Sequence, residues 1–236
     1  MRRRAFTVME VLIVCTIFSM LSALLWFALR NVSDLWRQSD SKDDAVRELI
    51  RARTALTRDL RNASSVHFAT AKVGPNLTGF DGDAVTFLSS DSGASSSEWN
   101  LTSDGRAALP AQITYYLVVP NPAGEVAAGP PDSHGYEQQD PYKWLVRRVD
   151  PGGTALNPAW NSWLVRPTSP NPGPNQSVLS TRLLGFRVLH DGPMWMLELS
   201  AVAIKDARHR GSLGATPLRD TPYTLIDRFS VRSQNI

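Results

Sequence analysis

The first part of the chain passes from a continuous apolar run into a helical amphipathic pattern. Residues 11–29 carry no charged side chain and are mostly large and apolar. A run of this length suits one membrane-spanning helix of roughly 20 residues. Neither Gly nor Pro occurs before Gly74, so the pattern predicts one long helix from about Phe6 to Ala63, too long to lie within one bilayer.

The second half of this expected helix carries one apolar stripe. Its members recur at steps of three and four residues, with Ile50 alongside: Val46, Leu49, Leu56, Leu60 and Ala63. We expect this stripe to pack against a globular domain. Ser and Asp compete for backbone hydrogen bonds, so the polar stretch from Ser39 to Asp44 is where we expect a kink or a second helix start.

After Gly74 the pattern changes to short strand-like runs between turn residues. The expected strands are 84–88, 113–119, 143–149, 183–189, 194–204 and 223–231. The pair Asp191-Gly192 predicts a hairpin, and the Ser- and Pro-rich stretches 89–104, 120–141 and 167–176 predict surface loops. A helix followed by strands indicates an α+β domain, with the long helix packed on a mostly antiparallel sheet.

Charge argues against a nucleic-acid partner. The chain has 25 Lys and Arg against 22 Asp and Glu, but three of the basic residues are Arg2, Arg3 and Arg4. Without that leader the charges balance, whereas a nucleic-acid binder keeps a basic patch. Five arginines between residues 47 and 61 alternate with acids, which favours a solvated helix face with pairs such as Asp43 to Arg47.

No pattern of catalysis, metal binding or cofactor binding stands out. The chain lacks a nucleophile elbow, a phosphate-binding loop and paired His or Cys metal spacings, so we predict that it is not an enzyme and binds no cofactor. Asp81 and Asp83 could join Asp91 around Ca²⁺, but Asp-Gly-Asp is also an ordinary turn before a strand, which is the favoured interpretation. The single Cys15 lies in the apolar run, which excludes an intramolecular disulfide.

Trp160 and Trp163 stand in an expected loop. Loop tryptophans of this kind either complete a core or form an exposed partner-binding patch. Both interpretations are open at the level of the sequence.

The segment from Ala5 to Val14, with Phe6 after a small residue and Glu10 as the one acid, resembles the processing site of type IV pilins and type II secretion pseudopilins. The resemblance implies cleavage by prepilin peptidase between Ala5 and Phe6 and N-methylation of Phe6. It also implies that Glu10 pairs with the free amine of a neighbouring subunit during assembly. Ala5 departs from the usual Gly of that family.

A looser resemblance covers the later half of the chain. Ile-x-Tyr-Tyr at 113–116, Leu-x-Arg-Arg at 145–148, Gly-Phe-x-Val at 185–188 and a closing strand ending near Arg232 are similar to the J-type minor pseudopilins and the W-type minor pilins. This implies a minor subunit of a type II secretion pseudopilus, or alternatively of a type IV pilus. Its implied partners are other minor subunits, the inner-membrane assembly platform and membrane lipid.

The resemblance also implies a division of the chain and a location. Residues 1–5 would be a leader, 6–29 the transmembrane half of the helix, 30–64 its amphipathic half, and 65–236 a periplasmic β-rich domain. Basic residues remain on the cytoplasmic side of a span, so the protein would be a single-pass inner-membrane protein that is later drawn into the filament. A cleaved secretory signal or an ordinary signal anchor attached to a periplasmic binding domain is the alternative.

Overall fold

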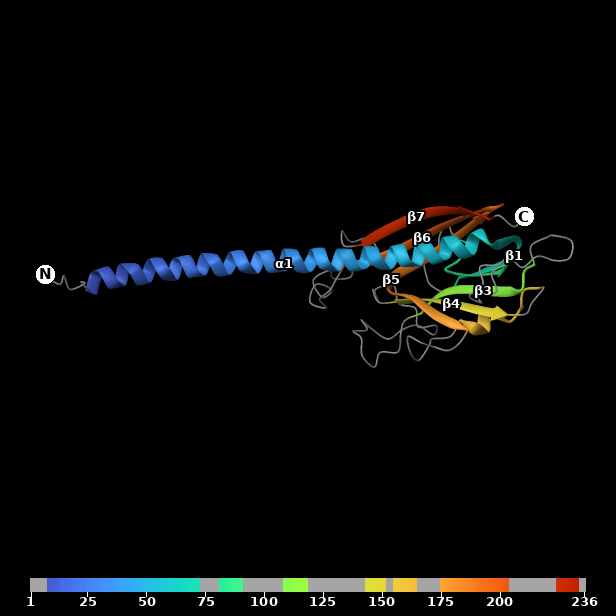
Figure 1. Ribbon diagram of the computed structural model, residues 1–236, viewed down its shortest axis with the longest axis horizontal. Coiled ribbons are helices and arrows are strands. Elements are labelled where there is room, and N and C mark those ends of the chain that lie inside the picture. Colours follow the sequence, from blue (N-terminus) through green and yellow to red (C-terminus); the bar gives the residue numbers. More distant parts are fainter. Residues whose placement is uncertain are drawn as a thin grey trace. The chain divides into compact units, whose positions relative to one another are not determined.

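The computed structural model describes residues 8–72, 81–90, 108–118, 143–151, 155–164, 175–203 and 224–233, and among them it contains one long helix followed by an antiparallel sheet. Helix α1 runs from Val8 to Arg61. The α+β fold predicted from the pattern is confirmed (Figure 1). Two compact units divide the chain between Ser41 and Lys42, inside the polar stretch where a kink was expected. The helical assignment nevertheless continues through that stretch.

Seven strands form one meandering sheet in which each strand pairs antiparallel with the next in the sequence. Their bounds are β1 Ala63–Ala71, β2 Ala84–Ser89, β3 Ala111–Val118, β4 Lys143–Pro151, β5 Gln176–Asp191, β6 Met194–Val202 and β7 Thr224–Arg232. A short 3-10 helix, η1, spans Trp160–Trp163. Within the second unit the sheet curls around the C-terminal part of α1 (Figure 1).

The hairpin predicted at residues 191–192 is confirmed. Asp191 pairs with Met194 across a two-residue turn, and Gly192 takes a positive φ of 57°, a conformation that suits Gly. Strand β1 is the element that the sequence did not predict. It begins after the single turn residue Asn62, directly at the end of α1.

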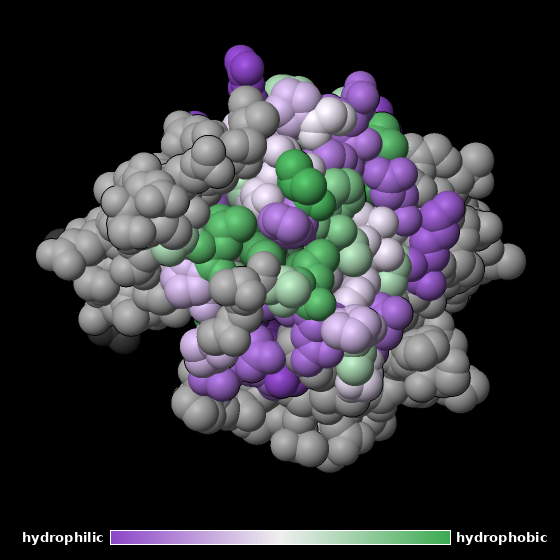
Figure 2. All heavy atoms as spheres, turned by 90° about the vertical axis from the view of Figure 1, so that its right-hand side faces the viewer, coloured by the Kyte–Doolittle hydropathy of each residue, from purple (hydrophilic) through white to green (hydrophobic). Residues whose placement is uncertain are grey.

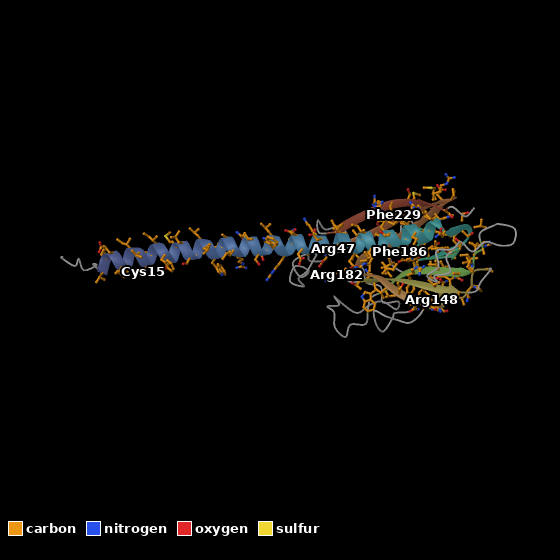
Figure 3. All side chains as sticks on the ribbon, viewed as in Figure 1. Cys15, Arg47, Arg148, Arg182, Phe186 and Phe229 are labelled. Carbon is orange, nitrogen blue, oxygen red and sulfur yellow. The ribbon has the colours of Figure 1, made fainter. Side chains whose placement is uncertain are left out.

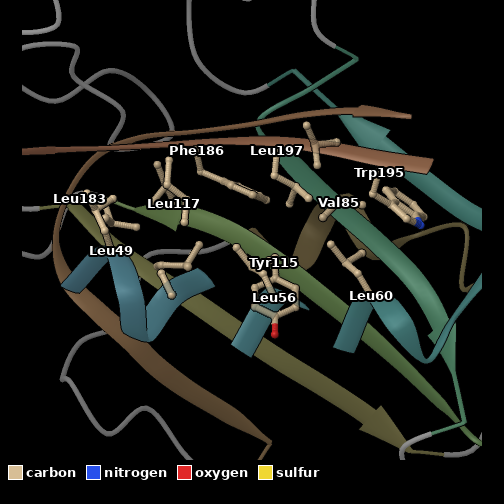
Figure 4. Packing of buried hydrophobic residues seen from close by; sticks show 14 of the residues in the cluster. Leu49, Leu56, Leu60, Val85, Tyr115, Leu117, Leu183, Phe186, Trp195 and Leu197 are labelled. Carbon is tan, nitrogen blue, oxygen red and sulfur yellow. The ribbon is translucent and has the colours of Figure 1, made fainter. Parts of the chain in front are cut away.

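The main core lies between α1 and the concave face of the sheet. Leu49, Leu56 and Leu60 project from the helix among Tyr115 and Phe186 of the sheet (Figure 4). The predicted stripe is correct for these leucines but wrong for Val46 and Ile50, which are 42% and 58% exposed. The helix instead buries alanines at positions 45 and 52, because small side chains let it lie close to the strands.

A second cluster occupies the opposite face of the sheet. It joins Ala84, Tyr116, Val118, Trp144, Val146 and Trp160. Because side chains alternate between faces along a strand, Tyr115 enters the main core while Tyr116 enters this one. Both faces are therefore covered over β2 and β3, and every residue of these two strands is buried.

Few large apolar side chains stay exposed in the described part of the second unit. On the strands, those more than a third exposed are Val66, Met196 and Ile226. In the end-on view, hydrophilic residues surround a small apolar patch on this unit (Figure 2).

Candidate functional site

The N-terminal part of α1 has the surface of a membrane span. Every residue from Val8 to Asp40 is exposed, including each large apolar side chain. Figure 3 shows these side chains projecting outward around the helix, Cys15 among them. By length and composition this is the one helix in the described residues that could cross a membrane. So much exposed apolar surface is stable only when lipid or another helix covers it.

The hydroxyl groups of Thr16 and Ser19, inside this segment, are satisfied by the helix itself. The Thr16 Oγ1 donates to the carbonyl oxygen of Leu12 at 2.7 Å, and the Ser19 Oγ donates to that of Cys15 at 2.8 Å. Such bonds let these two hydroxyl groups enter hydrocarbon without water. Near the C-terminal end of the apolar run, the Arg30 guanidinium lies 5.5 Å from the centre of the Trp26 ring, a pairing suited to a membrane interface.

Glu10 belongs to the first turn of α1 as the structure describes it. An acid there is favoured by the positive end of the helix dipole. The processing residues Ala5 and Phe6 lie outside the described residues, so the cleavage and methylation expected there stay predictions.

A buried polar cluster ties α1 to the sheet. The Asp59 side chain is fully buried, although the sequence pattern counted it among the solvated acids. Its Oδ2 accepts hydrogen bonds from the Tyr115 hydroxyl at 2.6 Å and from the Arg147 Nε at 2.5 Å. Its Oδ1 accepts one from the Arg58 Nε at 2.9 Å. One carboxylate therefore joins the last turn of the helix to β3 and β4.

The protonation states in this cluster are set by burial and by the charge on Asp59. Burial, together with the neighbouring carboxylate, raises the pKa of the Tyr115 hydroxyl well above its usual value, so the hydroxyl keeps its proton and donates it. Burial opposes the charge on Arg147, but Asp59 and Tyr115 outweigh that effect and raise the pKa of the guanidinium. Tyr115 and Arg147 are thus both held in their protonated forms, as donors to the carboxylate.

Other buried charges link neighbouring strands. Glu198 on β6 lies 2.8 Å from the Nε of Arg228 on β7 and 3.9 Å from that of Arg187 on β5. The Lys143 Nζ, fully buried, donates to the carbonyl oxygen of Leu184 at 2.8 Å. These groups hold neighbouring strands together.

His190 sits in an aromatic cluster at the end of β5. Its ring centre lies 3.9 Å from that of Phe68 and 4.3 Å from that of Trp195. Burial lowers the pKa of the imidazole, and the nearby carboxylates of Asp81 and Asp191 only partly oppose this. Its Nε2 has no hydrogen-bond partner in the described part of the chain. The pattern around His190, beside the turn at Asp191, does not predict this packing.

Asp81 has a structural use in this region. Its Oδ2 accepts a hydrogen bond of 2.7 Å from the backbone N–H of His190, and Gly82 forms a bridge with Val188. Asp83 is also buried. Among the described residues no three His, Cys, Asp or Glu side chains gather to hold a metal ion. Asp91, the third member of the suggested calcium site, lies outside them.

Trp160 does not form an exposed partner-binding patch, which corrects one of the two interpretations of this loop. It is 5% exposed and packs in the second cluster. Gln112 on β3 helps to hold Trp160 in this position. The Gln112 Oε1 accepts a hydrogen bond of 2.9 Å from the backbone N–H of Asn157 and so fixes the loop to the sheet. The side chain of Trp163 lies outside the described residues.

Comparison with protein-family models, curated proteins and solved structures found no match for this chain.

Proposed function

We propose that the protein is a minor pseudopilin-like subunit that joins the tip or initiation complex of a type II secretion pseudopilus. The observation that carries this proposal is Glu10 in the first described turn of a helix whose residues are exposed and predominantly apolar as far as Trp36. A carboxylate at the edge of an apolar span costs free energy in lipid, and a positive charge on a neighbouring subunit would lower that cost. The free amine of a neighbouring subunit, processed at Phe6, is a partner of the right charge.

The same helix continues into the β-domain, and this supports a role in assembly. The apolar half would remain in the inner membrane until neighbouring helices replace lipid around it. Its C-terminal turns are anchored to the sheet through Leu56, Leu60 and Asp59. The periplasmic β-domain would therefore move with the helix when the subunit joins a filament, and would select its neighbours among the other minor subunits.

Mass spectrometry of the mature N-terminus tests the proposal. The full chain would be expressed with and without a prepilin peptidase and purified in a non-ionic detergent. We expect a chain that begins at Phe6 with one methyl group on its amine, and only when the peptidase is present. Ala5→Leu, which replaces the small residue before the cut, is the control and should keep Met1.

Two outcomes would reject the proposal. A mature chain that begins near Arg30 would indicate a secretory signal, and a chain that retains Met1 with an active peptidase would indicate a permanent membrane anchor. Deletion in the source strain then separates the two filaments. Loss of protein secretion supports a pseudopilus, whereas loss of surface pili supports a type IV pilus.

A further inference from the structure

The acids and arginines that alternate along the sequence of α1 separate in space. Three of the four acids turn toward the sheet. Asp59 is buried against Tyr115, the Asp44 Oδ2 lies 3.3 Å from the Arg182 Nη1 of β5, and the Glu48 Oε2 accepts a hydrogen bond of 3.1 Å from the backbone N–H of Thr181. These three carboxylates therefore have hydrogen-bond or ion-pair partners on the sheet.

Four arginines are left on the opposite side of the helix. At about 100° per residue, Arg47, Arg51, Arg58 and Arg61 lie within roughly 40° of one line along α1, opposite the buried Leu56. All four are exposed. They are called the arginine face below, and Figure 3 labels the first of them.

The positive charge of the arginine face is only partly compensated. The Arg51 Nη1 forms a salt bridge with the Glu48 Oε1 at 3.4 Å, and the Arg58 Nε forms one with the Asp59 Oδ1 at 2.9 Å. Both acids also have partners on the sheet. Neither Arg47 nor Arg61 has an acid within salt-bridge distance in the described part of the chain. The expected pair between Asp43 and Arg47 does not form.

An open groove with a volume of about 750 Å³ runs beside these cations on α1. Its neutral lining is Ile50, Thr54, Thr57 and Asn62, and its charged lining is Arg53 together with Arg58 and Arg61 of the arginine face. The Arg53 guanidinium is held by Asp227 at 3.3 Å and lies 5.1 Å from the Phe229 ring centre. Thr54 and Thr57 have short side chains that let another backbone come close, and the exposed Ile50 offers an apolar contact.

We infer that the arginine face binds an acidic helix of a partner protein. The four cations recur at steps of three, four and seven residues over about 21 Å, which is the spacing of one helical face. A helix laid along the groove presents carboxylates at the same repeat and packs its small residues against Thr54 and Thr57. The neutral floor favours a protein over a nucleic acid, since no described aromatic side chain lines the groove for base stacking.

Binding of such a helix does not require that the protein be a filament subunit, so the two ideas can fail separately. The probe is a fluorescent helical peptide of Ala and Glu with Glu along one face, and the control peptide has Gln in place of Glu. Fluorescence anisotropy would be measured with the full chain in non-ionic detergent at low and physiological salt. We expect binding of the Glu peptide only, weakening with salt.

Matched variants locate the surface. Arg47→Gln, Arg51→Gln and Arg61→Gln together remove three charges from the arginine face but leave Arg58 beside Asp59. The control removes three exposed arginines elsewhere: Arg30→Gln, Arg37→Gln and Arg232→Gln. The face variant would lose three surface ion pairs with the Glu peptide, which corresponds to about a ten-fold loss of affinity. The control variant should change the affinity by less than about two-fold.

Circular dichroism would show that both variants are folded. Equal loss in the two variants, or equal binding of the Gln peptide, would overturn the inference. So would tighter binding of a DNA duplex or of vesicles containing phosphatidylglycerol, if that binding depended on the arginine face more strongly than binding of the peptide does.

Discussion

The Tyr115 hydroxyl donates a hydrogen bond of 2.6 Å to the Asp59 carboxylate, which joins the third strand of the sheet to the last turn of α1. Both side chains are fully buried. A buried carboxylate is tolerated only where donors replace the water that it has lost. Here Tyr115, Arg147 and Arg58 are those donors, and the first two tie the last turn of the helix to the sheet.

Removing Asp59 is expected to destabilise the β-domain strongly. Asp59→Ala leaves Arg147 largely buried without its acid, which costs about 3–5 kcal/mol. Tyr115→Phe removes one hydrogen bond to a charged group and should cost about 1.5–3 kcal/mol. Urea unfolding followed by tryptophan fluorescence measures both. A loss for Asp59→Ala no larger than that for the exposed Asp43→Ala would contradict the structural role.

Gly82 is expected to resist any larger side chain. A Cβ placed there would lie 2.4 Å from the carbonyl oxygen of Ala71, which is backbone of β1 and cannot rotate away. Gly82→Ala should therefore lower the urea midpoint and open the bridge to Val188. Gly192→Asn is the matched control, since its turn has open space and Asn tolerates positive φ. Comparable stabilities for the two variants would show that β1 can shift.

His190 should make the domain less stable in mild acid. Burial lowers the pKa of its imidazole in the folded chain, so the unfolded chain takes up a proton first as the pH falls through about 6.5. Stability contributed by the neutral ring is present above that pH and declines below it. His190→Phe should flatten the fall in urea midpoint between pH 7.5 and 5.5. The exposed His67→Gln should leave the wild-type profile unchanged, and an identical profile for His190→Phe would rule out this explanation.

Glu10→Val should preserve membrane insertion and impair assembly. Insertion becomes easier when a charge is removed from the apolar span, whereas the proposed pairing with a neighbour's amine is lost. The measurement is secretion or piliation in the source strain at matched protein level. Glu10→Gln, close in size but uncharged, should share the defect. Normal secretion or piliation with both variants would contradict the pairing of Glu10 with a neighbour's amine.

The fold could be predicted where burial in the core alone determines the pattern of apolar residues. Leu49, Leu56 and Leu60 recur at helical spacing and were assigned to the core correctly. Val46 and Ile50 were assigned to the core wrongly. The pattern of one helix shows that an apolar stripe exists but does not show how much of that stripe the sheet covers. Strand β1 was missed because a single turn residue, Asn62, separates it from α1, whereas the prediction relied on Gly and Pro as boundaries.

The sites were harder to predict, since they depend on contacts between residues far apart in the sequence. Asp59 looks like one more surface acid until Tyr115 and Arg147, 56 and 88 residues later, are placed around it. Trp160 looks like a loop residue until Gln112 pins the loop to the sheet. The arginine face could not be predicted for the same reason. It exists because the neighbouring acids of α1 bind partners on β3, β4 and β5, which are distant in the sequence.

The Asp59 cluster would also resist any load applied along the part of α1 that packs on the sheet. A pull along α1 acts in shear on its attachment to the sheet, and a slip of one residue moves the carboxylate by about 1.5 Å, enough to break short bonds to both Tyr115 and Arg147. The leucines of the core could re-pack after such a slip at modest cost, but a displaced buried charge could not. A pull on the helix would therefore be resisted at the Asp59 cluster, together with the contacts that Asp44, Glu48 and Arg53 make with the strands.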